Sequence, residues 1–164
     1  MIGTADLNKA IATLWNSSSL DSLFTEYWRG VRDTDDFLVL NDAEAAPGSP
    51  LPYVVFTVSS PSVQTRMSGV ARGKFHIRDT SLTFDIYAEQ ASNPNSAKEI
   101  AAELAEEVMK VFGGHPTVEP QEMELDNGHV LNVQYQQDYG ERQGDTAYHW
   151  IIEYTIKVDV PVKV

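Results

Sequence analysis

The sequence predicts an α+β protein in which a mostly antiparallel β-sheet carries helices packed on one face. Three observations lead to this class. Apolar residues recur at helical spacing near the N-terminus, a capped amphipathic helix occupies residues 95–113, and several other segments alternate apolar and polar side chains as strands do. The expected order of elements is α-α-β-β-α-β-β-β.

The length and composition indicate one domain, residues 1–164, that is large enough to bury its own core. Cysteine is absent, which excludes disulfides, thiolate zinc sites and thiol catalysis. The N-terminus has neither the basic region nor the apolar run of a signal peptide, and no segment approaches the roughly 20 apolar residues of a membrane span. We therefore expect a soluble protein that is made in the cytosol.

The first helical region covers residues 4–30 in two pieces. The run Ser17–Ser19 separates them, because serine caps helices more readily than it continues them. Gly30 is expected to end the second piece. The apolar positions at helical spacing are Leu7, Ile11, Leu14 and Trp15 in the first piece, and Leu20, Leu23, Phe24, Tyr27 and Trp28 in the second.

A connection and two strands should follow. Residues 32–52 start with acids and end in a Pro/Gly-rich stretch, which predicts a connection with one brief strand at Phe37–Leu40. The β-branched and aromatic segment Tyr53–Ser60 is the first firm strand. Residues 81–89 form a half-buried strand with one wet face. Its apolar face is expected to hold Leu82, Phe84, Ile86 and Ala88.

The clearest helix begins at Asn95 or Ser96 and ends at Gly113. Glu99 stands at about the capping-box position. One stripe of this helix is apolar and should pack on the sheet, namely Ile100, Leu104, Val108, Val111 and Phe112.

The C-terminal third should be β-structure. The run Asp126–Gly128 lies between two alternating segments and predicts a hairpin, since Asn-Gly suits a type I′ turn. Residues 138–146 are expected to form a polar loop. Residues 148–160 then alternate up to Pro161, which predicts a long strand that is central in the sheet or pairs with a neighbouring molecule.

We find no catalytic, cofactor-binding or metal-binding motif in the sequence. The glycines at 69 and 73 have the wrong spacing for a phosphate-binding loop, and no G-x-S-x-G element occurs. The acidic run Asp33–Asp36 lacks the glycine and the distal glutamate of a calcium loop. Glu122 and Glu124 would share a strand face, as chance pairs of acids often do. The histidines are isolated in sequence: His76, His115, His129 and His149.

Charge is unevenly distributed along the chain. The formal net charge is -12, yet residues 45–78 contain four basic residues and no acidic one. We interpret residues 65–78 as the connection between the strand at Tyr53 and the strand at Ser81. It is either a solvated loop of incidental charge or an arm that docks on an acidic surface, the nearest of which is another copy of the protein. The candidate interface residues are Arg66, Arg72, Lys74 and Arg78.

The stretches LPYVVFTV, SLTFDIYAEQASNPNSAKEIAAELAEEVMKVF and YHWIIEYTIKVDVPV follow one another in this order. This succession resembles the tail-terminator and tail-completion proteins of long-tailed bacteriophages. Residues 51–161 take part in the resemblance, and the segment Leu7–Trp28 fits the helix that precedes the sheet in that family. The long Pro/Gly-rich connection before Pro52 and the two-piece first helix depart from the family pattern.

The resemblance implies a structural virion protein without enzymatic activity or cofactor. Its subunits would form a ring, usually a hexamer, that caps the tail tube, joins it to the head-side connector and leaves a channel for DNA. The implied partners are other copies, the tail tube protein and a connector or stopper protein, and the implied location is the tail or neck of a virion assembled in the host cytoplasm. Two alternatives stay open: a tail-tube or other neck protein, and a small-molecule-binding or enzymatic domain of the helix-grip kind.

Overall fold

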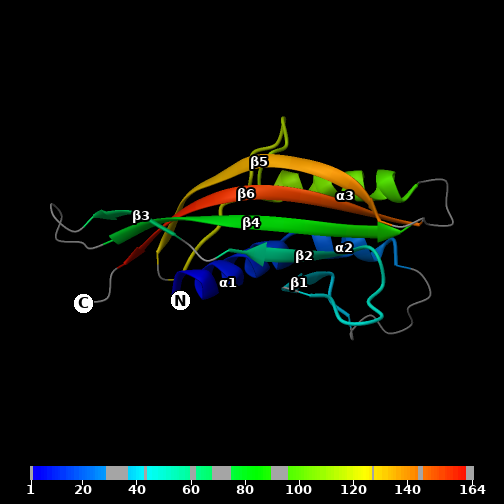
Figure 1. Cartoon of the computed structure of the whole chain (residues 1–164), viewed down its shortest axis with the longest axis horizontal. Helices are drawn as coiled ribbons and strands as arrows, with labels where there is room; N and C mark the ends of the chain where they lie inside the picture. Colours follow the sequence, from blue (N-terminus) through cyan, green and yellow to red (C-terminus); the bar gives the residue numbers. More distant parts are fainter. Residues whose placement is uncertain are drawn as a thin grey trace.

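The computed structural model describes residues 2–28, 37–42, 44–59, 62–67, 75–89, 96–126, 128–143 and 146–161. Figure 1 shows the strands as one sheet with all three described helices together on one side of it. The predicted α+β class is therefore confirmed. The elements are α1 (Ile2–Ser17), α2 (Leu20–Thr25), β1 (Leu40–Asp42), β2 (Tyr53–Val58), β3 (Ser62–Met67), β4 (Phe75–Glu89), α3 (Ala97–Phe112), β5 (His129–Gln143) and β6 (Ala147–Pro161).

The long strands β4 and β6 form the centre of the sheet. The strand order is β1-β2-β4-β6-β5, and β3 pairs with β4 on the edge that β2 also uses. The described pairs are antiparallel except β1–β2, which is parallel. At the junction of β2 and β3, the Thr80 hydroxyl donates to the Ser59 carbonyl at 2.6 Å. This bond holds the chain against β4 where one strand ends and the next begins.

An aromatic cluster joins the helices to the sheet. Phe84 of β4 is fully buried, and its ring centroid lies 4.8 Å from Phe112 of α3, 6.1 Å from Trp15 of α1 and 6.0 Å from Tyr154 of β6. The Tyr154 hydroxyl donates to the Gly113 carbonyl at 2.7 Å, so the polar atom of this buried side chain has a partner. The apolar positions predicted to face one another from helix and strand therefore meet in one core.

Local sequence explains how α3 begins and ends. The Ser96 hydroxyl accepts a hydrogen bond from the Glu99 backbone N–H, so Ser96, one of the two predicted caps, is the N-cap. Gly113 follows the last turn with a φ of 126°, a conformation that favours glycine. The predicted apolar stripe of this helix is buried against β4 and β6.

The first helical region divides where the serines predicted it. The Ser18 hydroxyl donates to the Trp15 carbonyl, and the Trp15 indole N–H donates to Asp21 Oδ1 at 2.5 Å, which ties α1 to α2 across the break. However, α2 ends at Thr25 and not near Gly30, which lies outside the described residues. The Trp28 indole N–H instead donates to the Pro52 carbonyl at 2.8 Å. The chain after α2 is therefore held by a contact with a distant segment and not by helical hydrogen bonds.

The brief strand expected at Phe37–Leu40 forms at Leu40–Asp42. The prediction of two paired strands around Asp126–Gly128 is wrong. One isolated bridge joins Leu125 to Gly128, and the run before it is not a strand. The Gln121 N–H donates to the Val111 carbonyl at 2.9 Å, which holds this run beside the end of α3.

The polar loop predicted at residues 138–146 is also wrong, because β5 continues to Gln143 and pairs with β6 throughout. Register shifts occur between Val130 and Asn132 and between Tyr135 and Gln137. Each shift inserts one residue and so exchanges the two faces of the strand. The alternation of polar and apolar residues is therefore interrupted, although the strand is not.

Beyond the second shift, Asp138 faces the helix side of the sheet and accepts hydrogen bonds from the Tyr135 hydroxyl and, at 2.9 Å, from the Trp150 indole N–H. Burial and Asp138 together raise the pKa of Tyr135 to about 12. Tyrosine in an unfolded chain has a pKa of about 10. The stabilising contribution of Tyr135 is therefore complete below pH 10 and is lost as the pH rises towards 12.

We expect Tyr135→Phe to lower the free energy of unfolding by about 1 kcal/mol at neutral pH, because the hydrogen bond to Asp138 is lost. The difference from wild type should then narrow as the pH rises above 10, since the wild-type tyrosine loses its advantage when it ionises. Urea unfolding across this pH range measures both effects. A difference in unfolding free energy between the two proteins that stays constant with pH would contradict the raised pKa of Tyr135.

Candidate interaction surface

The described residues of the basic run predicted as a connection, 65–67 and 75–78, lie in strands β3 and β4. Arg66 lies in β3 opposite His76, and Arg78 lies in β4 opposite Val63. The strands pair here because β6 extends to Pro161 and supports β4 along its whole length. We call residues 62–78 the basic arm. Figure 1 shows its paired strands at the end of the sheet that lies beyond the helices.

The structure places two of the four predicted interface residues in the paired strands of the basic arm. Arg66 and Arg78 belong to its two strands, and Arg72 and Lys74 lie outside the described residues. Their predicted role in an interface stays a prediction.

The sheet face opposite the helices forms a second surface, which we call the open face. Cross-strand register brings Tyr53, Tyr87 and His149 into one row over β2, β4 and β6. The neighbouring row contains Asp85 and Tyr139. Val55 and Ile151 complete this row and are 8% exposed, so the open face is partly apolar and not uniformly polar.

His149 is the centre of the open face. Its ring stacks on Tyr87 with a centroid distance of 4.3 Å and an interplanar angle of 10°, and Tyr53 adjoins Tyr87 at 5.3 Å. His149 Nε2 lies 2.7 Å from Asp85 Oδ1, and Nδ1 lies 3.3 Å from Gln143 Nε2. If the Gln143 amide donates to Nδ1, the proton of the neutral ring is on Nε2 and is donated to Asp85. The ring is thereby held rigidly although it lies on the uncovered side of the sheet.

An aspartate and the histidine that it orients are also two of the three members of a catalytic triad. In a triad, however, the second ring nitrogen accepts the proton of a nucleophile. Here Gln143 lies against that nitrogen, and the face of the ring is covered by Tyr87. The contacts of His149 therefore fit a rigid structural cluster better than a general base.

The open face presents neutral tyrosines among carboxylates. Burial raises the pKa of Tyr53, and burial followed by the charge of Asp85 raises that of Tyr87. Both hydroxyls therefore keep their protons at neutral pH. By register, the described acidic residues of this face are Asp79, Asp85, Glu89, Glu141, Glu153 and Asp159, and its described lysine is Lys157.

A third surface is a groove between α2 and α3, with a volume of about 210 Å³, which we call the α2–α3 groove. Its apolar lining comes from Leu23 and Leu104, and the Tyr27 hydroxyl crosses it to donate to Glu103 at 3.1 Å. The charged residues that line it are Glu26, Glu103, Glu106, Glu107 and Lys110. Four carboxylates and one ammonium group therefore line the groove.

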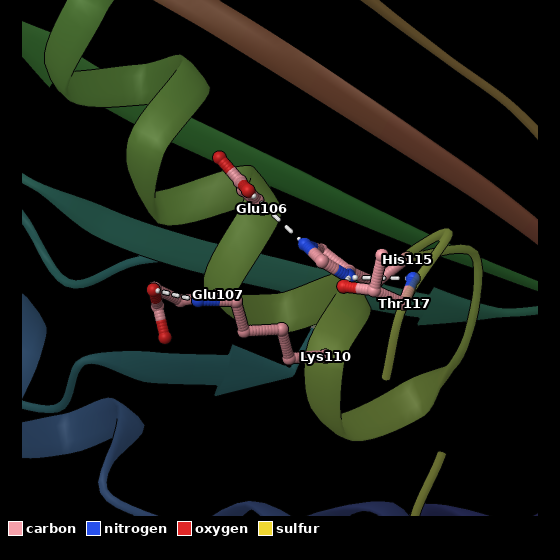
Figure 2. A network of polar contacts seen from close by, with 5 residues as sticks. All are labelled: Glu106, Glu107, Lys110, His115 and Thr117. Atoms are coloured by element: carbon pink, nitrogen blue, oxygen red, sulfur yellow. Dashed lines mark hydrogen bonds and ion pairs between the residues drawn. The ribbon is translucent and has the colours of Figure 1, made fainter. Parts of the chain in front are cut away.

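Figure 2 shows how two of these carboxylates are held on α3. Lys110 Nζ lies 2.8 Å from Glu107 Oε1, one turn away on the same helix. Glu106 Oε1 lies 3.1 Å from His115 Nε2, and the other ring nitrogen of His115 accepts from the Thr117 N–H at 3.2 Å. The loop that follows α3 is thus fastened to the helix, which keeps the rim of the groove in place.

The sequence predicted the polar side of β4 but not the cluster on it. The alternation of residues 81–89 predicts Asp85 and Tyr87 on the wet face of their strand, whereas His149 is isolated from the other histidines in sequence. The alternation of residues 148–160 places His149 on the side of the strand opposite Trp150, and this is the sequence feature that could have placed His149 on the wet face. Register between strands 64 residues apart then decides that His149 meets Asp85.

Within the described part of the chain, no group of three or more histidine, aspartate or glutamate side chains is arranged to hold a metal ion. No helix in that part combines the length and apolar character that crossing a bilayer requires.

Comparison with known proteins supports the fold. No protein-family model matches the sequence, and no curated protein matches it either. Among solved structures, the fold is similar to a chain from the "Virion of native gene transfer agent (GTA) particle", with a TM-score of 0.51 and 17% sequence identity. The match covers 95% of this chain and 96% of that chain. The similarity therefore extends over the whole succession of elements and concerns the fold alone.

Proposed function

We propose that this protein is a non-enzymatic structural subunit of a phage-like virion. Copies of it assemble into a ring that caps the tail tube, joins it to the head-side connector and leaves a channel for DNA. The observation that carries the proposal is the similarity to a chain of a gene transfer agent virion over 95% of this chain and 96% of the other. A match along both chains favours a shared building plan over a shared fragment.

The charge distribution supports this role. A net charge of -12 opposes adhesion of DNA phosphates, so a duplex could pass such a ring without being gripped. The basic arm gives each subunit one surface of opposite sign, which suits contact with an acidic copy or with the tube. The interface residues in this proposal are Arg66, Arg72, Lys74 and Arg78.

The packing between α3 and the sheet argues against the helix-grip alternative. A domain of that kind encloses its ligand between the sheet and the long helix. In this protein Phe84, Phe112 and Tyr154 fill that space and are at most 1% exposed. A ligand could enter only by displacing the centre of the core.

Light scattering after gel filtration, followed by negative-stain imaging, tests the proposal. We expect the purified protein to form closed rings of about six subunits once its concentration exceeds the assembly threshold. Long tubes would identify a tail-tube protein instead, because such a protein stacks ring on ring. A monomer that persists at high concentration and low salt would contradict the proposal.

A further inference from the structure

The α2–α3 groove carries a negative potential in a confined space. Burial, the hydrogen bond to Glu103 and the charge of Glu26 all raise the pKa of Tyr27. Glu107 and, more weakly, Glu106 raise the pKa of Lys110. These effects on the two titratable groups beside the carboxylates agree with a surface that favours cations.

The groove also offers apolar contact. Leu23 and Leu104 line it beside the Tyr27 ring. Arginine and lysine side chains bury their methylene groups on such surfaces while their charged ends reach carboxylates. The groove therefore fits a basic peptide segment better than a free inorganic cation.

The basic arm has the complementary composition. Residues 62–78 contain four basic residues and no acidic one, in a chain with twice as many acids as bases. The open face is a weaker acceptor, because its carboxylates are spread over three strands, whereas those of the groove line one hollow.

The described strands of the arm lie far from the groove of their own chain. At about 3.3 Å per residue, Phe75 lies roughly 30 Å along β4 from Phe84, which packs on α3. Pairing of β4 with β6 up to Phe75 opposite Pro161 prevents the strand from folding back. Figure 1 shows the paired strands of the arm at one end of the molecule and α2 and α3 over the other half.

We propose that the basic arm of one copy docks in the α2–α3 groove of the next copy. The inference rests on the proposed ring, and it names the two surfaces that join its subunits. Because the arm and the groove are different surfaces, the contact is head-to-tail. Such contacts propagate around a ring until it closes, whereas a contact between identical surfaces stops at a dimer.

Two charge-reversed variants test this contact. The arm variant carries Arg66→Glu, Arg72→Glu and Lys74→Glu, and the groove variant carries Glu26→Lys and Glu103→Lys. Each variant alone brings like charges together at every contact, so we expect assembly to require at least a roughly tenfold higher concentration than wild type. In an equimolar mixture, every negative arm can meet a positive groove and every positive arm a negative groove. The mixture should therefore assemble into rings of alternating subunits at nearly the wild-type concentration.

A matched control carries Glu122→Lys and Glu124→Lys, which changes the net charge as the groove variant does, at exposed positions outside the groove. It should assemble as wild type does. Glu103→Gln keeps an acceptor for the Tyr27 hydroxyl and should weaken assembly less than the groove variant. Circular dichroism and the thermal midpoint verify that each variant is folded, and mass is measured by light scattering at low salt.

The outcomes separate this inference from the proposed function. If wild type forms rings and either charge-reversed variant alone does so equally well, the arm-in-groove contact is wrong while the ring stands. Failure of the mixture to assemble overturns the contact as well. If wild type itself remains monomeric, the proposed function is contradicted, and the inference falls with it.

Discussion

Phe84→Ala is expected to lower the free energy of unfolding by about 3–5 kcal/mol, the range for truncation of a buried phenylalanine. The Phe84 ring is fully buried and contacts aromatic rings from α1, α3 and β6 at once. Its neighbours belong to three different elements, so they cannot close the cavity without moving a helix. Urea unfolding followed by tryptophan fluorescence measures the loss, since Trp15 is one of those neighbours.

Phe84→Leu is the matched comparison, because it keeps most of the apolar volume and should cost less than about 1.5 kcal/mol. A loss below that value for Phe84→Ala would mean that the helices pack loosely against β4. The proposed assembly depends on this packing. The α2–α3 groove and the basic arm keep their positions only while the helices stay fastened to the sheet.

Gly114→Ala is expected to cost about 3 kcal/mol, because two penalties act at one residue. The backbone has a φ of 101°, which side chains other than glycine rarely adopt. A Cβ atom would also lie 2.5 Å from Tyr135 Cδ2. The Tyr135 ring cannot yield easily, since its hydroxyl is bound to Asp138 and its ring centroid lies 6.2 Å from that of Tyr154 in an edge arrangement.

Gly48→Ala separates the two penalties. Gly48 has a φ of 79°, but nothing lies within 4 Å of the position of an added Cβ. It should therefore cost only about 1–2 kcal/mol, the backbone penalty alone. Equal losses at the two glycines, measured by urea unfolding, would show that the Tyr135 ring gives way.

Elements with an uninterrupted local pattern could be predicted from the sequence. The cap at Ser96, the apolar stripe of α3 and the alternation of β6 each depend on residues a few positions apart. The strand β5 escaped prediction because its two register shifts exchange its faces along its length. The strand β3 escaped it because a short polar segment becomes a strand only when a longer strand offers it an edge.

The candidate surfaces likewise differ in how far the sequence alone predicts them. The uneven distribution of charge can be seen in the sequence alone, because the residues of the basic arm include four bases and no acid. Its proposed acceptor cannot be seen there, because Glu26 and Glu103 are 77 residues apart and meet only when α2 packs beside α3. The open-face cluster likewise requires Asp85 and His149 to stand opposite each other on neighbouring strands.

By itself, the sequence determined the α+β class, the two ends of α3, the alternation of the central strands, the acidic charge and the basic run. All of these follow from composition or from contacts between residues close in the chain. The tertiary structure decided the strand order, the extent of β5, the His149 cluster and the groove between α2 and α3. These features depend on strand register and on helix packing, which bring together residues distant in sequence. Many pairings of similar chemistry are compatible with the local sequence, and the pairing that forms is the one that buries a single common core.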